Sequence, residues 1–363
     1  MKQGRGLLAW GVAVVLACSV GLAAQNKDEK KRDDAQKKEI QNIVKIVDDA
    51  SAGQAAPNDL SLKWVREDVL KAQGNKEYVP FTVSVDPSKV TGGTVALYWR
   101  VVSKNAPAAA PVETGKKDDT KDKDKKKPDY AYEDISFVQV AASQTPMLVS
   151  RSFTVPAGPY DVFVVVKEPT PEKAPKNAPT PKMSVLKQNV AVPDFWNGEL
   201  NTSSVILAQR IDPLPAPLTP QQQSDRPYAL GQMEIVPVLD TKFAKKSELS
   251  TFMLIYNPKV DKDNKPDVTV EYNFCQIAPG NEPKPGEPCK SGEKFFNKTN
   301  PQNLNASTLP PQFDFAAGHQ LQSGQAVSLG PFPEGQYRLE IKVTDKIANK
   351  SLTRDVNFTV SAS

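Results

Sequence analysis

The sequence has very little histidine and cysteine, and this scarcity limits the chemistry that it can support. Its 363 residues include one His and three Cys. A histidine-based triad would therefore have His319 as its single candidate base, and no Ser in a G-x-S-x-G turn accompanies it. No glycine-rich phosphate-binding loop occurs either. We therefore expect a protein that is not an enzyme, without catalytic, metal-binding or cofactor-binding residues.

A strong excess of one charge is also missing. The 46 basic and 42 acidic residues leave a net charge of +4, and no basic stripe interleaved with aromatic residues is present. These features exclude the electrostatic signature of a nucleic-acid-binding protein. A hydrolase that uses two carboxylates stays a distant alternative, because the separation of carboxylates across a folded sheet cannot be read from a sequence.

Long apolar runs are confined to the N-terminus, where the pattern is typical of a secretory signal peptide. Lys2 and Arg5 precede an apolar stretch over residues 7–17, and "GLAAQN" supplies small residues before the chain turns polar. We expect a signal peptide over 1–24. Two alternatives stay open: lipidation of Cys18, since "VLAC" resembles a bacterial lipoprotein box, or an uncleaved membrane anchor. In each case the protein is exported, to the periplasm or the cell surface.

Removal of the signal peptide leaves Cys275 and Cys289. The intervening "QIAPGNEPKPGEP" is rich in proline and glycine, as in loops that a disulfide closes in exported proteins. Two thiols cannot build a structural zinc site alone, and a redox pair would require closer spacing such as C-x-x-C. We predict a structural disulfide between the two cysteines.

The 32 prolines lie between short apolar runs, which favours strands and loops over helices. Within residues 337–344, apolar residues alternate with polar ones, so that Arg338, Glu340 and Lys342 are expected to face water. The fold class is therefore predicted to be all-β, with several antiparallel strands arranged in sandwiches.

An internal repeat organises these strands. "VPAGPYDVFVVV" at 155–166 returns as "FPEGQYRLEIKV" at 332–343, and further blocks match in the same order, with Phe81 opposite Phe252 and Pro87 opposite Pro258. The matches indicate a duplicated module, with one copy over 76–194 and the other over 228–363. Each copy is expected to fold by itself.

The Gly-x-Tyr element of the repeat indicates an immunoglobulin-like sandwich. Such domains carry a tyrosine near the start of one strand whose hydroxyl bonds back to the preceding loop. Tyr160 and Tyr337 occupy this position, and Trp99 and Tyr272 are expected to fill the two cores. The inter-sheet disulfide of antibody domains is absent, because the residues two positions after the tyrosines are not cysteines.

Three segments differ from the modules. Residues 25–75 begin with a charged stretch, and apolar residues then recur at helical spacing over 40–47, which predicts a short amphipathic helix followed by a tether. Residues 104–129 form a Lys/Asp-rich insertion that we expect to be disordered. Residues 195–227 are expected to form a strand and a proline-rich linker.

Three stretches carry a resemblance to a known kind of protein: "SSVILAQ", "LSTFMLIYNP" and "PEGQYRLEIKVTD". They look like the β-sandwich regions of exported bacterial proteins with von Willebrand A-related or GWxTD domains, most of which are uncharacterised. The resemblance covers 200–360 and, through the repeat, much of 77–193. Both the GWxTD motif and the Asp-x-Ser-x-Ser metal site are missing, so the resemblance implies a fold but no activity.

A comparison of the repeated strands suggests where a partner would bind. On the side where the second copy carries charged residues, the first copy carries Phe163 and Val165, which need a cover. The cover is either a segment of the same chain, such as the helix, or a partner: a second copy or another envelope protein. We expect an envelope interaction or scaffolding protein, or else a carbohydrate- or peptide-binding accessory protein of an envelope enzyme system.

Overall fold

A computed structural model describes residues 38–105, 130–141, 143, 145–170, 180–315 and 317–362. The predicted signal peptide, the candidate lipidation site Cys18 and residues 106–129 of the predicted insertion lie outside the described residues. Within the described ranges, no helix has the length and apolar character needed to cross a membrane.

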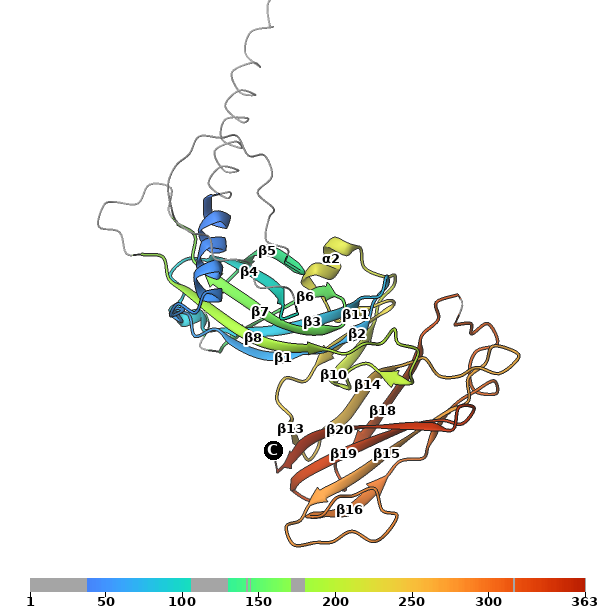
Figure 1. Ribbon diagram of the computed structural model, residues 1–363. Coiled ribbons are helices and arrows are strands. Elements are labelled where there is room, and N and C mark those ends of the chain that lie inside the picture. The colour runs from blue at the N-terminus through green and yellow to red at the C-terminus, as the bar shows by residue number, and fades with distance from the viewer. Residues whose placement is uncertain are drawn as a thin grey trace, which may run out of the picture.

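The first half of the described chain forms two sheets that enclose a common core (Figure 1). Sheet A has the strand order β5-β4-β7-β8. In sheet B, β1 and β2 pair with successive parts of β3, and β6 pairs with β3 along its length. The strands are β1 Lys63–Glu67, β2 Leu70–Lys71, β3 Glu77–Val85, β4 Thr94–Ser103, β5 Tyr132–Gln139, β6 Met147–Val155, β7 Gly158–Lys167 and β8 Met183–Val192.

The second half of the described chain forms two larger sheets. Sheet C has the order β11-β12-β10-β14-β18, with β9 also on β14, and sheet D has the order β13-β20-β19-β15-β16, with β17 also on β15. The strands are β9 Asn201–Thr202, β10 Ile206–Pro213, β11 Ala229–Leu230, β12 Met233–Pro237, β13 Lys242–Ala244, β14 Glu248–Tyr256, β15 Val268–Ile277, β16 Glu293–Lys298, β17 Gln302–Leu304, β18 Leu321–Ser328, β19 Gly335–Asp345 and β20 Lys350–Ser361.

Helices are a minor part of the described chain. A helix occupies residues 38–51, α2 spans Pro220–Asp225, and η1, a single 3-10 turn, spans Pro87–Lys89. The predicted all-β class is thus confirmed. Its β-sandwich-like cores form because alternating apolar residues on facing sheets can be buried only against each other.

The aromatic residues predicted for the two cores are buried there. Trp99 on β4 and Tyr272 on β15 are both 1% exposed. The Trp99 indole N–H donates to the Ser152 carbonyl on the facing sheet, and the Tyr272 hydroxyl shares a hydrogen bond with Ser323. Each large side chain therefore fills its core with its polar atom paired.

Both repeated tyrosines make the hydrogen bond that the sequence pattern predicts. Tyr160 Oη donates to the Pro156 carbonyl at 2.8 Å, and Tyr337 Oη donates to the Pro333 carbonyl at 2.7 Å. The intervening glycines have φ values of 150° and 144°, which other residues rarely adopt. The two corners are thus locally alike.

Two segments assigned outside the sandwiches contribute strands to them. β1 and β2 lie within the predicted tether, yet both pair with β3, which extends the first sandwich beyond its predicted start at residue 76. β9 and β10 lie within residues 195–227, where a strand and a linker were predicted, and both pair with β14. β1 and β2 are short, partly exposed strands with little apolar alternation, and the sequence pattern therefore missed them.

The matched pair Phe81 and Phe252 does not occupy equivalent positions. Phe81 points into the core of its own sandwich, whereas Phe252 belongs to the apolar cluster of the first sandwich and not to that of its own. The reason is that β14 is buried on both faces, so its apolar residues do not alternate. Without alternation, the phase of a strand cannot be read from its sequence.

Candidate functional site

The outer face of sheet A, where a partner was considered, is covered by the chain itself. Phe163 and Val165 are 2% and 0% exposed, and they form one apolar cluster with Ile43 and Val47 of the helix over 38–51. Figure 1 shows this helix, in dark blue, lying across β4 and β7. Of the two covers that the sequence left open, the structure has the intramolecular one.

Two buried cations on sheet A fix the helix in place. Lys167 Nζ pairs with Glu39 and donates to Thr170 Oγ1 at 3.0 Å. Arg100, which is 1% exposed, pairs with Asp48 at 2.7 Å and stacks under the Tyr130 ring at 3.6 Å. Since an unpaired buried cation is costly, these contacts make the helix an integral layer of the first sandwich.

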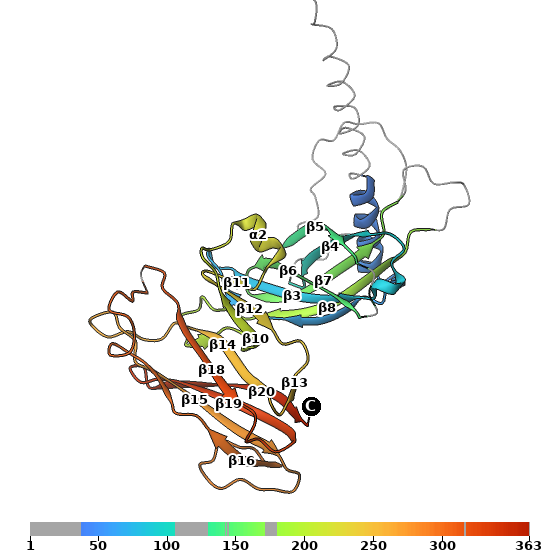
Figure 2. The ribbon, with the colours of Figure 1, turned by 180° about the vertical axis from the view of Figure 1, so that it is seen from behind.

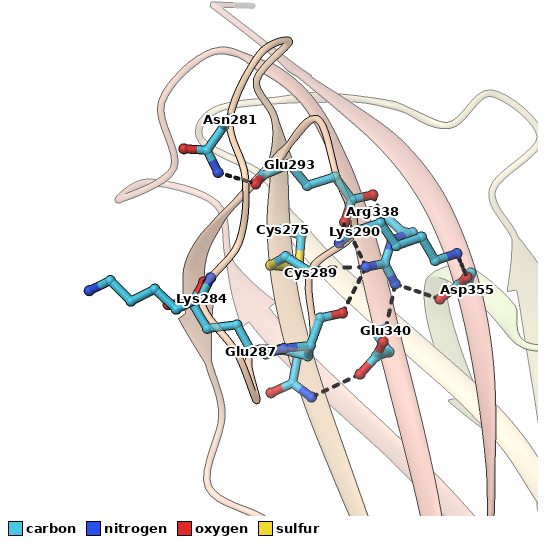
Figure 3. The surroundings of a disulfide bond; sticks show 12 residues. Cys275, Asn281, Lys284, Glu287, Cys289, Lys290, Glu293, Arg338, Glu340 and Asp355 are labelled. Carbon is cyan, nitrogen blue, oxygen red and sulfur yellow. Dashed lines mark hydrogen bonds and ion pairs between the residues drawn. A yellow bond between two sulfur atoms is a disulfide. The ribbon is translucent and has the colours of Figure 1, made fainter.

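A disulfide-closed loop covers the corresponding face of the second sandwich (Figure 3). Cys275 and Cys289 form a disulfide with a Cα–Cα distance of 5.6 Å, and both side chains are buried. Closing a loop of this size stabilises a fold by up to about 3 kcal/mol. The disulfide thus fastens the loop to β15 across the outer face of sheet D.

Arg338 is the centre of the contacts beneath this loop. The sequence pattern predicts that it faces water, but it is 4% exposed because the loop lies over it. Its guanidinium donates to both Glu293 carboxylate oxygens at 2.7 Å, to Asp355 Oδ1 at 2.7 Å and to the Pro288 carbonyl at 2.9 Å. Burial raises the pKa of the Glu293 carboxyl, but the hydrogen bonds from Arg338 and from the Lys290 backbone N–H, together with the charges of these two cations, outweigh burial and lower that pKa.

The cysteines and Glu293 do not form a metal site. Their ligand atoms are the one group among the described residues with suitable spacing, but both sulfurs are committed to the disulfide and Glu293 to Arg338. His319 lies in an exposed loop, where its Nδ1 accepts from the Asp314 backbone N–H at 3.1 Å. It has no Ser or Cys nucleophile among the hydrogen-bond partners described for it.

A crevice of about 490 Å³ lies between the disulfide loop and sheet D. One wall is the loop at Gly286, Glu287 and Pro288, and the floor is formed by outward residues of β15, β16 and β19. These floor residues are Glu271, Asn273, Phe295, Lys298, Glu340 and Lys342. The crevice therefore offers both hydrogen-bond donors and acceptors, with one aromatic side chain.

A continuous apolar core joins the two sandwiches. Leu70 and Val69 of the first sandwich cluster with residues from the outward side of sheet C, including Phe252, Leu254 and Tyr256. Figure 1 and Figure 2 both place β10 and β14 on the side of the second sandwich that faces the first. The two sandwiches therefore pack directly against each other, without an open linker between them.

Buried polar contacts accompany this core. Arg66 pairs with Asp68 and also donates to the Val238 carbonyl at 3.1 Å, and Tyr228 Oη donates to Asp68 Oδ2 at 2.8 Å. Burial raises the pKa of Asp68, and the contacts with Arg66 and Tyr228 offset part of that rise. Sequence reasoning missed this cluster, because Arg66 and Asp68 lie in the segment assigned as a tether.

A second group of contacts at the junction involves the strap, by which we mean residues 193–200 between β8 and β9. The Phe195 ring packs on Tyr256 at 4.9 Å, and Asn257 Nδ2 donates to the Phe195 carbonyl at 2.9 Å. The Trp196 indole N–H donates to the Lys76 carbonyl at 3.1 Å. The strap is thereby held by both sandwiches at once.

Comparisons with known proteins give limited similarity. No family model matches the chain, and no curated protein matches it. Among solved structures, trypsin-activated α2-macroglobulin from Escherichia coli is 11% identical, with a TM-score of 0.20, over 85% of this chain and 17% of that one. Red sea bream transglutaminase is 9% identical, with a TM-score of 0.18, over 87% of this chain and 33% of that one. The chain thus spans a third or less of the length of either protein.

Proposed function

We propose that the protein is an exported, non-enzymatic interaction or scaffolding protein of the cell envelope, built as a rigid pair of immunoglobulin-like sandwiches. The observation that carries the proposal is the junction, where an apolar core and buried polar contacts run from one sandwich to the other. A pair joined in this way holds its two ends at a fixed distance, which is what a spacer or scaffold requires.

The immunoglobulin-like character and the internal duplication are part of the proposal. Their support is the equivalent hydrogen bond of Tyr160 and Tyr337, each to the carbonyl four residues earlier, and the equivalent core positions of Trp99 and Tyr272. A tyrosine corner of this kind is typical of such domains.

Export is supported by the signal-like N-terminus and by the disulfide, since stable disulfides form mainly outside the cytoplasm. Mass spectrometry of the mature protein should find an N-terminus at or near Gln25. An acylated Cys18 would make it a lipoprotein, whereas an intact Met1 in a cytoplasmic fraction would contradict export.

Photo-crosslinking in intact cells tests the interaction role. A photoreactive phenylalanine analogue placed at Phe137, Leu148, Ile277 or Ile347, all large apolar residues that are at least 39% exposed, should give one discrete adduct from neighbouring positions on a single surface. The same analogue at the buried Phe163 is the control. No adduct from any exposed position would contradict the proposal.

The crevice beside the disulfide loop favours a second function, the binding of a neutral carbohydrate or an extended peptide. Its mixed donors and acceptors match such ligands better than a strongly charged one. Saturation-transfer NMR with soluble cell-wall oligosaccharides and with a polyglycine-serine peptide tests it. Binding that survives Asn273→Ala with Glu340→Ala would place the ligand elsewhere.

A further inference from the structure

Glu77, the first residue of β3, is a buried carboxylate at the junction of the two sandwiches. It is 0% exposed. Its Oε1 accepts from the Phe195 backbone N–H of the strap at 3.0 Å, while Oε2 is buried with no hydrogen-bond partner among the described residues. A buried carboxylate with one unpaired oxygen is costly as an anion and far less costly as a neutral acid.

The charged and titratable groups that face Glu77 do not compensate an anion well. Lys71 of β2 contributes a positive charge to the surroundings of Glu77, but its Nζ donates to Asn257 Oδ1 at 3.0 Å and lies over the Trp196 ring at 4.2 Å. Asp194 of the strap adds a negative charge, and Tyr256 of β14 presents a neutral hydroxyl. The elements around Glu77 therefore favour its protonated form.

The hydrogen bond of Glu77 belongs to a chain of contacts that spans the junction. Glu77 holds the Phe195 amide, Phe195 packs on Tyr256, and the Tyr256 hydroxyl accepts from the Lys71 backbone N–H at 3.0 Å. Ionisation of Glu77 would draw either its Oε2 toward water or Lys71 away from Trp196. Both movements disturb the strap, which both sandwiches share.

We propose that the protonation state of Glu77 controls how firmly the junction is held. The protonated carboxyl holds the strap in place, and loss of the proton to solvent loosens the strap. The proposal concerns the strength of the junction and does not depend on which partner the protein binds. Burial, followed by repulsion from Asp194, raises the pKa of Glu77 to about 7 even though the Phe195 amide opposes the shift. The change in the attachment of the strap would therefore take place near neutral pH.

The test is ¹⁹F NMR of the mature chain labelled with 5-fluorotryptophan, titrated from about pH 5 to about pH 9, a range that spans the transition. The Trp196 resonance is assigned by its loss in Trp196→Phe. We expect this resonance to move with one midpoint near pH 7. Glu77→Gln, which mimics the protonated acid, should abolish the movement.

Two further variants make the result specific. Glu199→Gln removes another carboxylate of the strap, one that pairs with Lys350 at the surface, and should leave the titration unchanged. Asp194→Asn should lower the midpoint, because it removes the negative charge next to Glu77. A Trp196 resonance that stays fixed over the whole range, or that titrates equally in Glu77→Gln, would overturn the proposal.

Discussion

At the scale of single residues, Arg338 shows how strongly one side chain can fix a loop. Its partners Glu293 and Asp355 come from different strands, and Glu293 is itself buried. Arg338→Met would leave that carboxylate without its cation, a change that typically costs about 3–5 kcal/mol. We expect a loss of this size in the free energy of unfolding, measured by urea denaturation.

Arg210 provides the control for this prediction, because it forms an exposed pair with Asp212. Arg210→Met should change the free energy of unfolding by less than about 1 kcal/mol. Comparable losses in the two variants would mean that the covering loop does not bury the Arg338 contacts in solution.

The raised pKa of Glu77 predicts an unusual pH dependence of stability. A carboxyl whose pKa rises on folding, here from 4.5 to about 7, stabilises the fold fully below pH 4.5, and this contribution is lost as the pH rises to about 7. The span corresponds to on the order of 3 kcal/mol. In the natural sequence, the urea midpoint should therefore be lower at about pH 8 than at about pH 5, and in Glu77→Gln this difference should shrink. A difference of the same size in both proteins would refute the assignment.

Some of these residues could be predicted from the sequence and others could not. The cysteine pair and the corner tyrosines depend on local spacing, which a sequence displays directly. Arg338 sits at a position where an alternating strand points away from its own core, and Glu77 sits at the first position of β3, in phase with the core residues of that strand. What covers such a position is decided by residues far away in the chain, and the local pattern carries no trace of them.

At the scale of elements, the helix over 38–51 behaves as a layer of the first sandwich. Ile43 is fully buried against sheet A, whereas Lys45, on the same helix, is exposed. Ile43→Ala should lower the free energy of unfolding by about 2–5 kcal/mol. Lys45→Ala changes the helix propensity by the same amount as Ile43→Ala, within a few tenths of a kcal/mol, and should leave the free energy of unfolding nearly unchanged. Urea or thermal denaturation of both variants measures the difference.

If the two helix variants were equally stable, the helix would not be docked in solution. The helical spacing of apolar residues was sufficient to predict this element, and the Phe163 and Val165 pair was sufficient to predict that something covers sheet A. The strands with one buried face were likewise predicted by alternation. β14 was misaligned because both of its faces are buried, which removes the period on which the prediction relies.

At the scale of the whole molecule, the shared core predicts coupled unfolding. A fragment over 76–194 lacks β1 and β2 together with Leu60, Leu62, Val69 and Leu70 of the core, so we expect it not to unfold cooperatively. A fragment over 38–194 restores these residues and should show a cooperative transition at a lower temperature than the mature chain.

Circular dichroism melts of the two fragments and of the mature chain check this prediction. The mature chain should give a single transition by far- and near-ultraviolet signals alike. Two well-separated transitions, with the first matching that of the 38–194 fragment, would show that the junction contributes little to stability.

The position of the covering helix in the chain also sets an order of events during synthesis. Glu39 and its partner Lys167 are 128 residues apart, so at about 5–20 residues per second the helix is complete on the order of ten seconds before its docking strand emerges. Throughout that interval Ile43 and Val47 have no sheet to pack against, because β4 and β7 must pair first. The helix is therefore made before the strands that it covers, and its apolar face is buried only once β4 and β7 have paired.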